Sequence, residues 1–186
     1  MLKKSYDILR DLYLEKISFG QGKRILDVGC GPRGNFINIP SEAYIGIDTS
    51  KKTINKLRER QDGKYLLMDA KQLNFKDGHF SYIISTSFFH HLSPQECLIV
   101  CGQMKRKLKK DGLAIIVDGV YPHSRVDMIG RTIRFFDRGR FVRNRDAFKN
   151  IFLKDFKVTS EYYFVEKFFA YCILVLGHKG IKNERA

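Results

Sequence analysis

The chain has 186 residues, of which 44% are hydrophobic and 29% are charged, and its formal net charge is +14. That length and balance fit one globular domain and exclude a disordered chain and a fibrous repeat. The N-terminus lacks the pattern of a secretory signal, and the longest apolar stretch, 168–176, is too short to cross a bilayer, so we expect a cytoplasmic protein that forms one domain over residues 1–186.

The first predicted elements are an amphipathic helix and two short strands. Apolar residues at helical spacing predict a helix within residues 1–22 that covers one edge of the sheet. A β-branched strand at 24–28 leads into a glycine loop at 29–34, and a second strand is expected at 44–48. The nine residues between the loop and the second strand leave room for only one or two helical turns.

The central part of the chain alternates helices and strands. Thr49 or Ser50 can cap a helix that ends near Arg60, and Ser93, followed by proline, begins a longer helix that ends near Leu108. Runs of β-branched and aromatic residues around these helices predict three strands, at 64–68, 79–86 and 112–117.

The C-terminal third combines two helices with a β-hairpin. Helical spacing of apolar residues predicts a helix at 126–136, whose other face carries arginines, and a second helix at 144–153. Two β-rich runs, 156–165 and 168–177, are too close together for a crossover helix, so we expect them to pair antiparallel.

This order of elements predicts the fold class. Strands alternating with helices are typical of an α/β fold, here a Rossmann-like, seven-stranded, mostly parallel sheet with helices on both faces and an antiparallel C-terminal hairpin strand. Ligands of such sheets bind beyond the carboxyl ends of the strands. The informative polar and glycine residues fall at those ends: 27–34, Asp48, Asp69 and 85–91.

The glycine loop is typical of a nucleotide site. Gly29, Gly31 and Gly34 fit the pattern GxGxxG, although such turns also arise for steric reasons alone, and an acid, Asp48, follows about twenty residues later. Asp27 would repel a pyrophosphate at the strand end and attract an ammonium group. The short crossover also lacks a long helix whose N-terminus could bind phosphate. Both features favour a cationic, phosphate-free ligand over NAD.

These residues resemble the motifs of class I S-adenosylmethionine-dependent methyltransferases, in the small-molecule, single-domain type similar to methyltransferase domain 11. The resemblance covers residues 24–118 motif by motif and the final strands more loosely. Residues 26–31 resemble the first motif and 46–50 the second, whereas Ser81 stands where the family usually has aspartate.

The resemblance implies S-adenosyl-L-methionine as the cofactor. Asp48 is expected to accept hydrogen bonds from both ribose hydroxyls, Asp69 to accept one from the adenine amino group, and the Ala70 amide to donate to a ring nitrogen. Ser87 is expected near the methionine part. The cofactor-binding residues implied in this way are Asp27, Gly29, Cys30, Gly31, Asp48, Thr49, Asp69, Ala70 and Ser87.

The resemblance also implies methyl transfer to a small-molecule acceptor that the sequence does not identify; anionic and lipid-linked molecules are candidate classes. A hydroxyl acceptor needs a general base, and His90 and His91 are the predicted catalytic residues, although either can simply cap the next helix. The segment 121–150 is expected to cap the acceptor pocket. Its arginines are expected either to bind an anionic substrate or to lie in solvent beside a core of phenylalanines. These arginines are Arg131, Arg134, Arg138, Arg140 and Arg143.

Other functions stay open on the sequence alone. The basic charge also fits RNA or another nucleic acid as acceptor, or peripheral membrane contact, but no Asn-Pro-Pro-Tyr-like motif or appended binding module is present. A NAD(P)-dependent oxidoreductase and a non-catalytic S-adenosylmethionine-binding protein are further alternatives. His90, His91, Cys97 and Cys101 lie close together in the sequence, but their spacing matches no zinc template, so we expect no metal. We expect the four cysteines of the chain to be buried and reduced. The sequence does not determine the oligomeric state.

Overall fold

A computed structural model describes residues 11, 16, 17, 22–34, 39–60, 63–121, 140–166 and 169–179. The seven strands are β1 (Ile25–Val28), β2 (Tyr44–Asp48), β3 (Lys64–Leu67), β4 (Phe80–Thr86), β5 (Leu108–Val120), β6 (Phe156–Glu166) and β7 (Phe169–His178). The helices are α2 (Lys51–Arg60), α3 (Pro94–Lys107) and α5 (Arg145–Asn150), with 3₁₀ turns η1 (Gly31–Arg33), η2 (Ser41–Ala43) and η3 (Phe89–His91).

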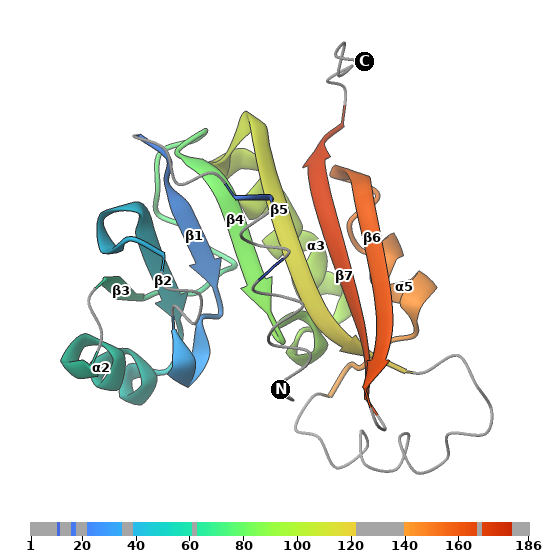
Figure 1. The fold of residues 1–186 in the computed structure, drawn as a ribbon, viewed down its shortest axis with the longest axis horizontal. Coiled ribbons are helices and arrows are strands. Elements are labelled where there is room, and N and C mark those ends of the chain that lie inside the picture. The colour runs from blue at the N-terminus through green and yellow to red at the C-terminus, as the bar shows by residue number, and fades with distance from the viewer. Residues whose placement is uncertain are drawn as a thin grey trace.

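All seven strands form one sheet in the order β3-β2-β1-β4-β5-β7-β6. The first five strands pair parallel, and β7 pairs antiparallel with both β5 and β6. The predicted α/β class, strand number and antiparallel C-terminal pair are therefore confirmed. The sheet order brings the carboxyl ends of β1, β2, β3, β4 and β5 to one edge (Figure 1).

Apolar side chains pack on both faces of the sheet. Helices α3 and α5 cover one face, where Val100, Met104 and Phe148 pack against alternate residues of the central strands. Helix α2 covers the other face through the buried residues Ile54 and Leu57. Figure 1 shows α3 and α5 behind the sheet. Both faces are thus shielded from water, as a mostly parallel sheet requires.

Side-chain caps set the starts of the helices. Ser93 begins α3 with a capping box: its side chain accepts from the Glu96 amide, and the Glu96 carboxylate accepts from the Ser93 amide. The Ser50 hydroxyl accepts from the Thr53 amide at the start of α2. Asn144 caps α5 by accepting from the Ala147 amide. These polar residues satisfy amides that the first helical turn leaves unpaired.

Some predicted boundaries differ from those in the structure. Strand β5 begins at Leu108, where Leu108 pairs with Phe80, because a register shift between Phe80 and Tyr82 lets the polar residues before Gly112 join the ladder. Helix α5 ends at Asn150 rather than near 153, since turns follow it. The crossover between β1 and β2 holds only two 3₁₀ turns among its described residues.

Two other predicted segments lie mostly outside the described residues. They are the N-terminal helix within 1–22 and the helix at 126–136; of the expected cap over 121–150, the structure describes 121 and 140–150. None of the helices in the described part of the chain is both long and apolar enough to cross a membrane.

Candidate active site

A cavity of about 700 Å³ opens at the carboxyl edge of the sheet. Its volume is within the range of small-molecule sites. It is lined by the ends of β1, β2 and β4 and by the loops that follow β3 and β4. All nine residues expected to bind the cofactor line this cavity: Asp27, Gly29, Cys30, Gly31, Asp48, Thr49, Asp69, Ala70 and Ser87.

Asp27 is a buried carboxylate at the wall of the cavity, with 4% of its surface exposed. Burial, together with the nearby charge of Asp48, raises its pKa from 3.8 to about 7, although a hydrogen bond from Tyr44 opposes that rise. The Tyr44 hydroxyl donates to Asp27 Oδ2 over 2.7 Å. An acid with a pKa near neutrality binds a cation most readily in its ionised form.

Asp48 connects the end of β2 to the glycine loop. Its Oδ2 accepts from the Gly31 amide at 3.1 Å, and its Oδ1 accepts from the Ser50 amide at 2.8 Å. Each carboxylate oxygen can accept more than one hydrogen bond, so the side chain is fixed in place while it keeps acceptor capacity toward the cavity.

Asp69 follows β3 and is exposed toward the cavity beside Lys71. Its Oδ1 accepts from the Lys71 amide at 2.8 Å, and the Lys71 ammonium lies 3.7 Å from Oδ2. The same ammonium binds Glu96 at 2.8 Å, so Lys71 bridges the adenine-side loop and α3. Lys71 was not predicted from the sequence, because an isolated lysine in a loop belongs to no motif.

Gly29 and Gly31 have positive φ angles, +68° and +59°, but they serve different purposes. A Cβ on Gly29 would lie 2.4 Å from the Phe88 ring, whereas no atom of the described residues lies within 4 Å of a Cβ on Gly31. The close approach at Gly29 is therefore made by the protein's own phenylalanine, and only Gly31 leaves open space for a ligand. Phe88, which the sequence did not single out, lines the cavity.

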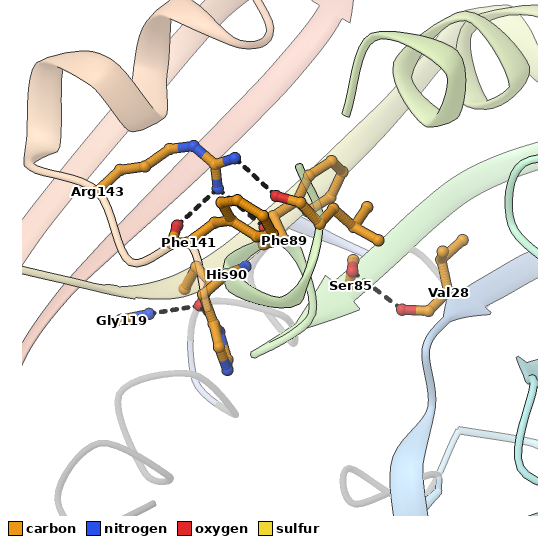
Figure 2. A network of polar contacts seen from close by, with 9 residues as sticks. Val28, Ser85, Phe89, His90, Gly119, Phe141 and Arg143 are labelled. Atoms are coloured by element: carbon orange, nitrogen blue, oxygen red, sulfur yellow. Dashed lines mark hydrogen bonds and ion pairs between the residues drawn. The ribbon is translucent and has the colours of Figure 1, made fainter. Parts of the chain in front are cut away.

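Ser87 has a φ of +55°, a value that a residue with a side chain adopts at an energetic cost. Its amide donates to the Val117 carbonyl at 2.8 Å, which fixes the turn after β4. Next to it, the buried Ser85 hydroxyl donates to the Val28 carbonyl and joins the ends of β4 and β1 (Figure 2).

The two predicted catalytic histidines occupy different environments. His91 lines the cavity and is exposed, whereas His90 is 8% exposed and does not line it. His90 is held by Asp118 at the end of β5: the Asp118 carboxylate contacts His90 Nδ1 and accepts from the backbone amides of His90 and Gly119. The rings of His90 and His91 lie 4.0 Å apart, centroid to centroid.

Arg143 fixes the turn that carries both histidines. Its guanidinium donates to the carbonyls of Phe89, Phe141 and Leu92 over 2.7 to 2.9 Å (Figure 2). Arg143 was one of the arginines expected to bind substrate or lie solvated, and its hydrogen bonds are instead with three backbone carbonyls and with Cys97 Sγ. Arg140 is exposed, and the other arginines of that cluster lie outside the described residues.

Replacing Arg143 with methionine is expected to lower the free energy of unfolding by about 2–4 kcal/mol, because three carbonyls lose a charged donor. Arg145→Met is the matched control. Arg145 pairs with Glu161 at 2.6 Å but its side chain is 42% exposed, so its loss should cost less than about 1 kcal/mol. Urea unfolding of both variants measures the difference. Equal losses would contradict the role given to Arg143.

All four cysteines are buried and free, as expected. Burial raises the pKa of the Cys30 thiol, which lies in the cavity wall, so this sulfur stays protonated. Within the ranges that the structure describes, no group of three or more His, Cys, Asp or Glu side chains is arranged to hold a metal ion.

The sheet order and the cavity define a class of protein. A parallel sheet with β7 inserted antiparallel, a glycine turn after β1 and an acid at the end of β2 are the features of the class I methyltransferase fold that the motifs predicted.

Comparison with known proteins supports this class. The family described as a methyltransferase domain matches residues 26–116. Over 108 residues the chain is 29% identical to cyclopropane-fatty-acyl-phospholipid synthase of Escherichia coli K12, a match that covers 55% of this chain and 28% of that protein. This chain thus spans less than a third of the length of that relative.

Solved structures agree on the fold. The PH0226 protein of Pyrococcus horikoshii OT3 superposes with a TM-score of 0.74 at 20% identity, covering 95% of this chain and 91% of the other. Geranyl diphosphate C-methyltransferase of Streptomyces coelicolor A3(2), solved with Mg²⁺, geranyl diphosphate and S-adenosyl-L-homocysteine, gives 0.74 at 10% identity over 92% and 79%. Residues 26–116 therefore match the methyltransferase domain that the motifs predicted, and the solved structures share the fold of the chain.

Proposed function

We propose that this chain transfers the methyl group of S-adenosylmethionine to a small-molecule acceptor, and that the carboxyl-edge cavity holds the cofactor. One observation carries the proposal: carboxylates from the ends of three neighbouring strands, Asp27, Asp48 and Asp69, line a single cavity beside the open Gly31 turn. A molecule with an ammonium group, a ribose and an adenine presents one donor group for each acid.

Each cofactor-binding residue has a part in this proposal. Asp27 binds the ammonium of the methionine part, Asp48 the ribose hydroxyls, and Asp69 with the Ala70 amide binds the adenine. Gly31 admits the ligand against the backbone, and Gly29 acts indirectly by admitting Phe88. The remaining residues, Cys30, Thr49 and Ser87, complete the walls.

The charge of the cavity opposes a dinucleotide. Three acids line it, and its cations, Arg33 and Lys71, both have partners within the protein. A pyrophosphate placed beside Asp27 would meet a buried negative charge, and the described residues directly after β1 form a 3₁₀ turn rather than the start of a long helix. This favours S-adenosylmethionine over NAD(P).

The bound cofactor supplies an electrophilic methyl group. The chain contributes alignment of the acceptor with that methyl group and exclusion of water. Of the two predicted catalytic residues, His91 lines the cavity and is placed to accept a proton from an acceptor group. His90 acts through position: Asp118 holds its Nδ1, and its ring packs against His91. The segment 121–150 would form the cap of the acceptor pocket in this single domain.

An anionic or lipid-linked molecule is the acceptor class that we favour. Among the similar proteins, one is named as a synthase of cyclopropane fatty acyl phospholipids and another as a methyltransferase of geranyl diphosphate. Both names describe an acceptor that combines an apolar chain with phosphate. The apolar part of the cavity wall, formed by Phe88, Leu92 and Val100, suits such a chain.

The proposal is tested by incubating the protein with methyl-labelled S-adenosylmethionine and cell extracts separated into anionic, lipid and nucleic-acid fractions. Label is expected in the anionic or lipid fraction, and Asp48→Asn protein should transfer none. Label confined to RNA or DNA would contradict the small-molecule acceptor. Cofactor binding without transfer to any fraction would support a non-catalytic protein instead.

A further inference from the structure

We propose that a second cavity, at the opposite edge of the sheet, binds the phosphate group of a phosphorylated ligand. This cavity has a volume of about 540 Å³ and is lined by Arg24, Lys64 and His79, together with Glu42 and residues 43–45 and 63. Among the residues that the structure describes, none lines both this basic-edge cavity and the cofactor cavity.

The topology of the sheet brings these three basic residues to one edge. Arg24, Lys64 and His79 each stand immediately before or at the start of a parallel strand, β1, β3 and β4 respectively. Parallel strands present all their amino ends at one edge, which is the upper edge in Figure 1. The Arg24 carbonyl accepts from the amides of Ser81 and Tyr82, so the backbone beneath the cluster is fixed.

Among the described residues of this cavity, the guanidinium of Arg24 contacts a histidine. Arg24 Nη1 lies 3.3 Å from His79 Nδ1, so the guanidinium donates to a neutral imidazole rather than to a carboxylate. Burial holds the pKa of His79 below its usual value, and the charges of Arg24, Lys109, Lys64 and Lys76 lower it further. Of the described lining residues, only Glu42 carries a carboxylate.

A phosphate fits this arrangement in charge and geometry. The Arg24 guanidinium offers a planar pair of donors, Lys64 offers an exposed ammonium, and His79 can gain a proton when an anion offsets the surrounding cations. In the cofactor cavity, in contrast, three acids line the part assigned to the cofactor, so a phosphate is disfavoured beside them.

The test follows the histidine signals by NMR as pH is varied, with and without inorganic phosphate. His79→Gln protein assigns the His79 signal among the five histidines. Phosphate is expected to raise the pKa of His79 by about one unit, whereas chloride at equal ionic strength should move it much less. The substitution Arg24→Gln should reduce the phosphate-induced shift in the pKa of His79 at least about threefold. Lys64→Gln, which removes an exposed ammonium, should do the same when made on its own.

Lys52→Gln on α2 is the matched control, because it removes one exposed positive charge far from this cavity and should respond to phosphate as the unaltered protein does. An equal shift with chloride, or an unchanged response in both Arg24→Gln and Lys64→Gln, would overturn the proposal. So would the absence of any shift with phosphate.

A second arm distinguishes the source of the phosphate. Vesicles of phosphatidylcholine containing phosphatidylglycerol are sedimented with each variant. Loss of vesicle binding in Arg24→Gln and Lys64→Gln identifies a lipid headgroup, whereas phosphate binding without vesicle binding identifies a free phosphate ester. S-adenosylhomocysteine binding is measured on the same samples. It should be unchanged in both variants, so failure of this proposal is distinguishable from failure of the proposed function.

Discussion

Asp27→Asn protein is expected to be more stable than the unaltered protein at pH 8 and to bind S-adenosylmethionine much more weakly. The carboxylate is 4% exposed and its pKa is raised from 3.8 to about 7, so its ionised form destabilises the folded chain. A shift of that size corresponds to an upper limit of about 4 kcal/mol, of which asparagine should recover ~2 kcal/mol. The Tyr44 hydroxyl can still donate to the amide oxygen.

The pH dependence of this difference follows from the direction of the pKa shift. A raised pKa in the folded state means that the stabilising effect of protonation is fully present below pH 3.8 and is lost as the pH rises through about 7. The stability advantage of Asp27→Asn should therefore be largest at pH 8 and should shrink toward pH 5. Urea unfolding at both pH values measures it, and an advantage independent of pH would rule out this cause.

The affinity for the cofactor should also depend on the ionisation of Asp27. If the ammonium of the cofactor binds ionised Asp27, binding removes a proton from a group with a pKa of about 7. The dissociation constant of the unaltered protein should then be about tenfold higher at pH 6 than at pH 8. Asp27→Asn should bind weakly at both values, with no such dependence.

Asp48→Asn is expected to lower cofactor affinity about 100-fold or more, because hydrogen bonds from two ribose hydroxyls to a charged acceptor contribute roughly 1.5–3 kcal/mol each. The substitution also places an amide donor opposite the amides of Gly31 and Ser50, which now donate to the carboxylate. Both effects act on the same loop. Calorimetric titration with S-adenosylhomocysteine gives the dissociation constant.

Asp146→Asn serves as the control for this titration, since Asp146 is an exposed acid in the first turn of α5, away from the cavity. It should bind the ligand as the unaltered protein does. If Asp48→Asn keeps an affinity within about threefold of the control, Asp48 does not contact the ribose and the role assigned to it is wrong.

Local patterns predicted the elements that surround the cavity. β2 has the predicted bounds, β1 begins one residue later than expected, and α3 begins at the proline after Ser93 because a side-chain cap is encoded within a few residues. The positions of Asp27, Asp48 and Asp69 at strand ends followed from the alternation of strands and helices. Alternation alone places every carboxyl end of a parallel strand at one edge.

Features that depend on distant residues were not predictable in this way. The packing of Phe88 against Gly29, the three carbonyls bound by Arg143 and the Asp118–His90 pair each join segments separated in sequence. The extension of β5 through Lys109 and Asp111 depends on a register shift in β4. A single sequence gives no signal for contacts of this kind, because each partner alone looks like an ordinary loop or core residue.

The most direct measurement is the crystal structure of the protein with S-adenosylhomocysteine. We expect the ligand to lie at the carboxyl edge of the sheet, with its amino group at Asp27, its ribose at Asp48 and its adenine at Asp69 and Ala70. A ligand bound elsewhere, or bound in this cavity without contact to those three carboxylates, would contradict it.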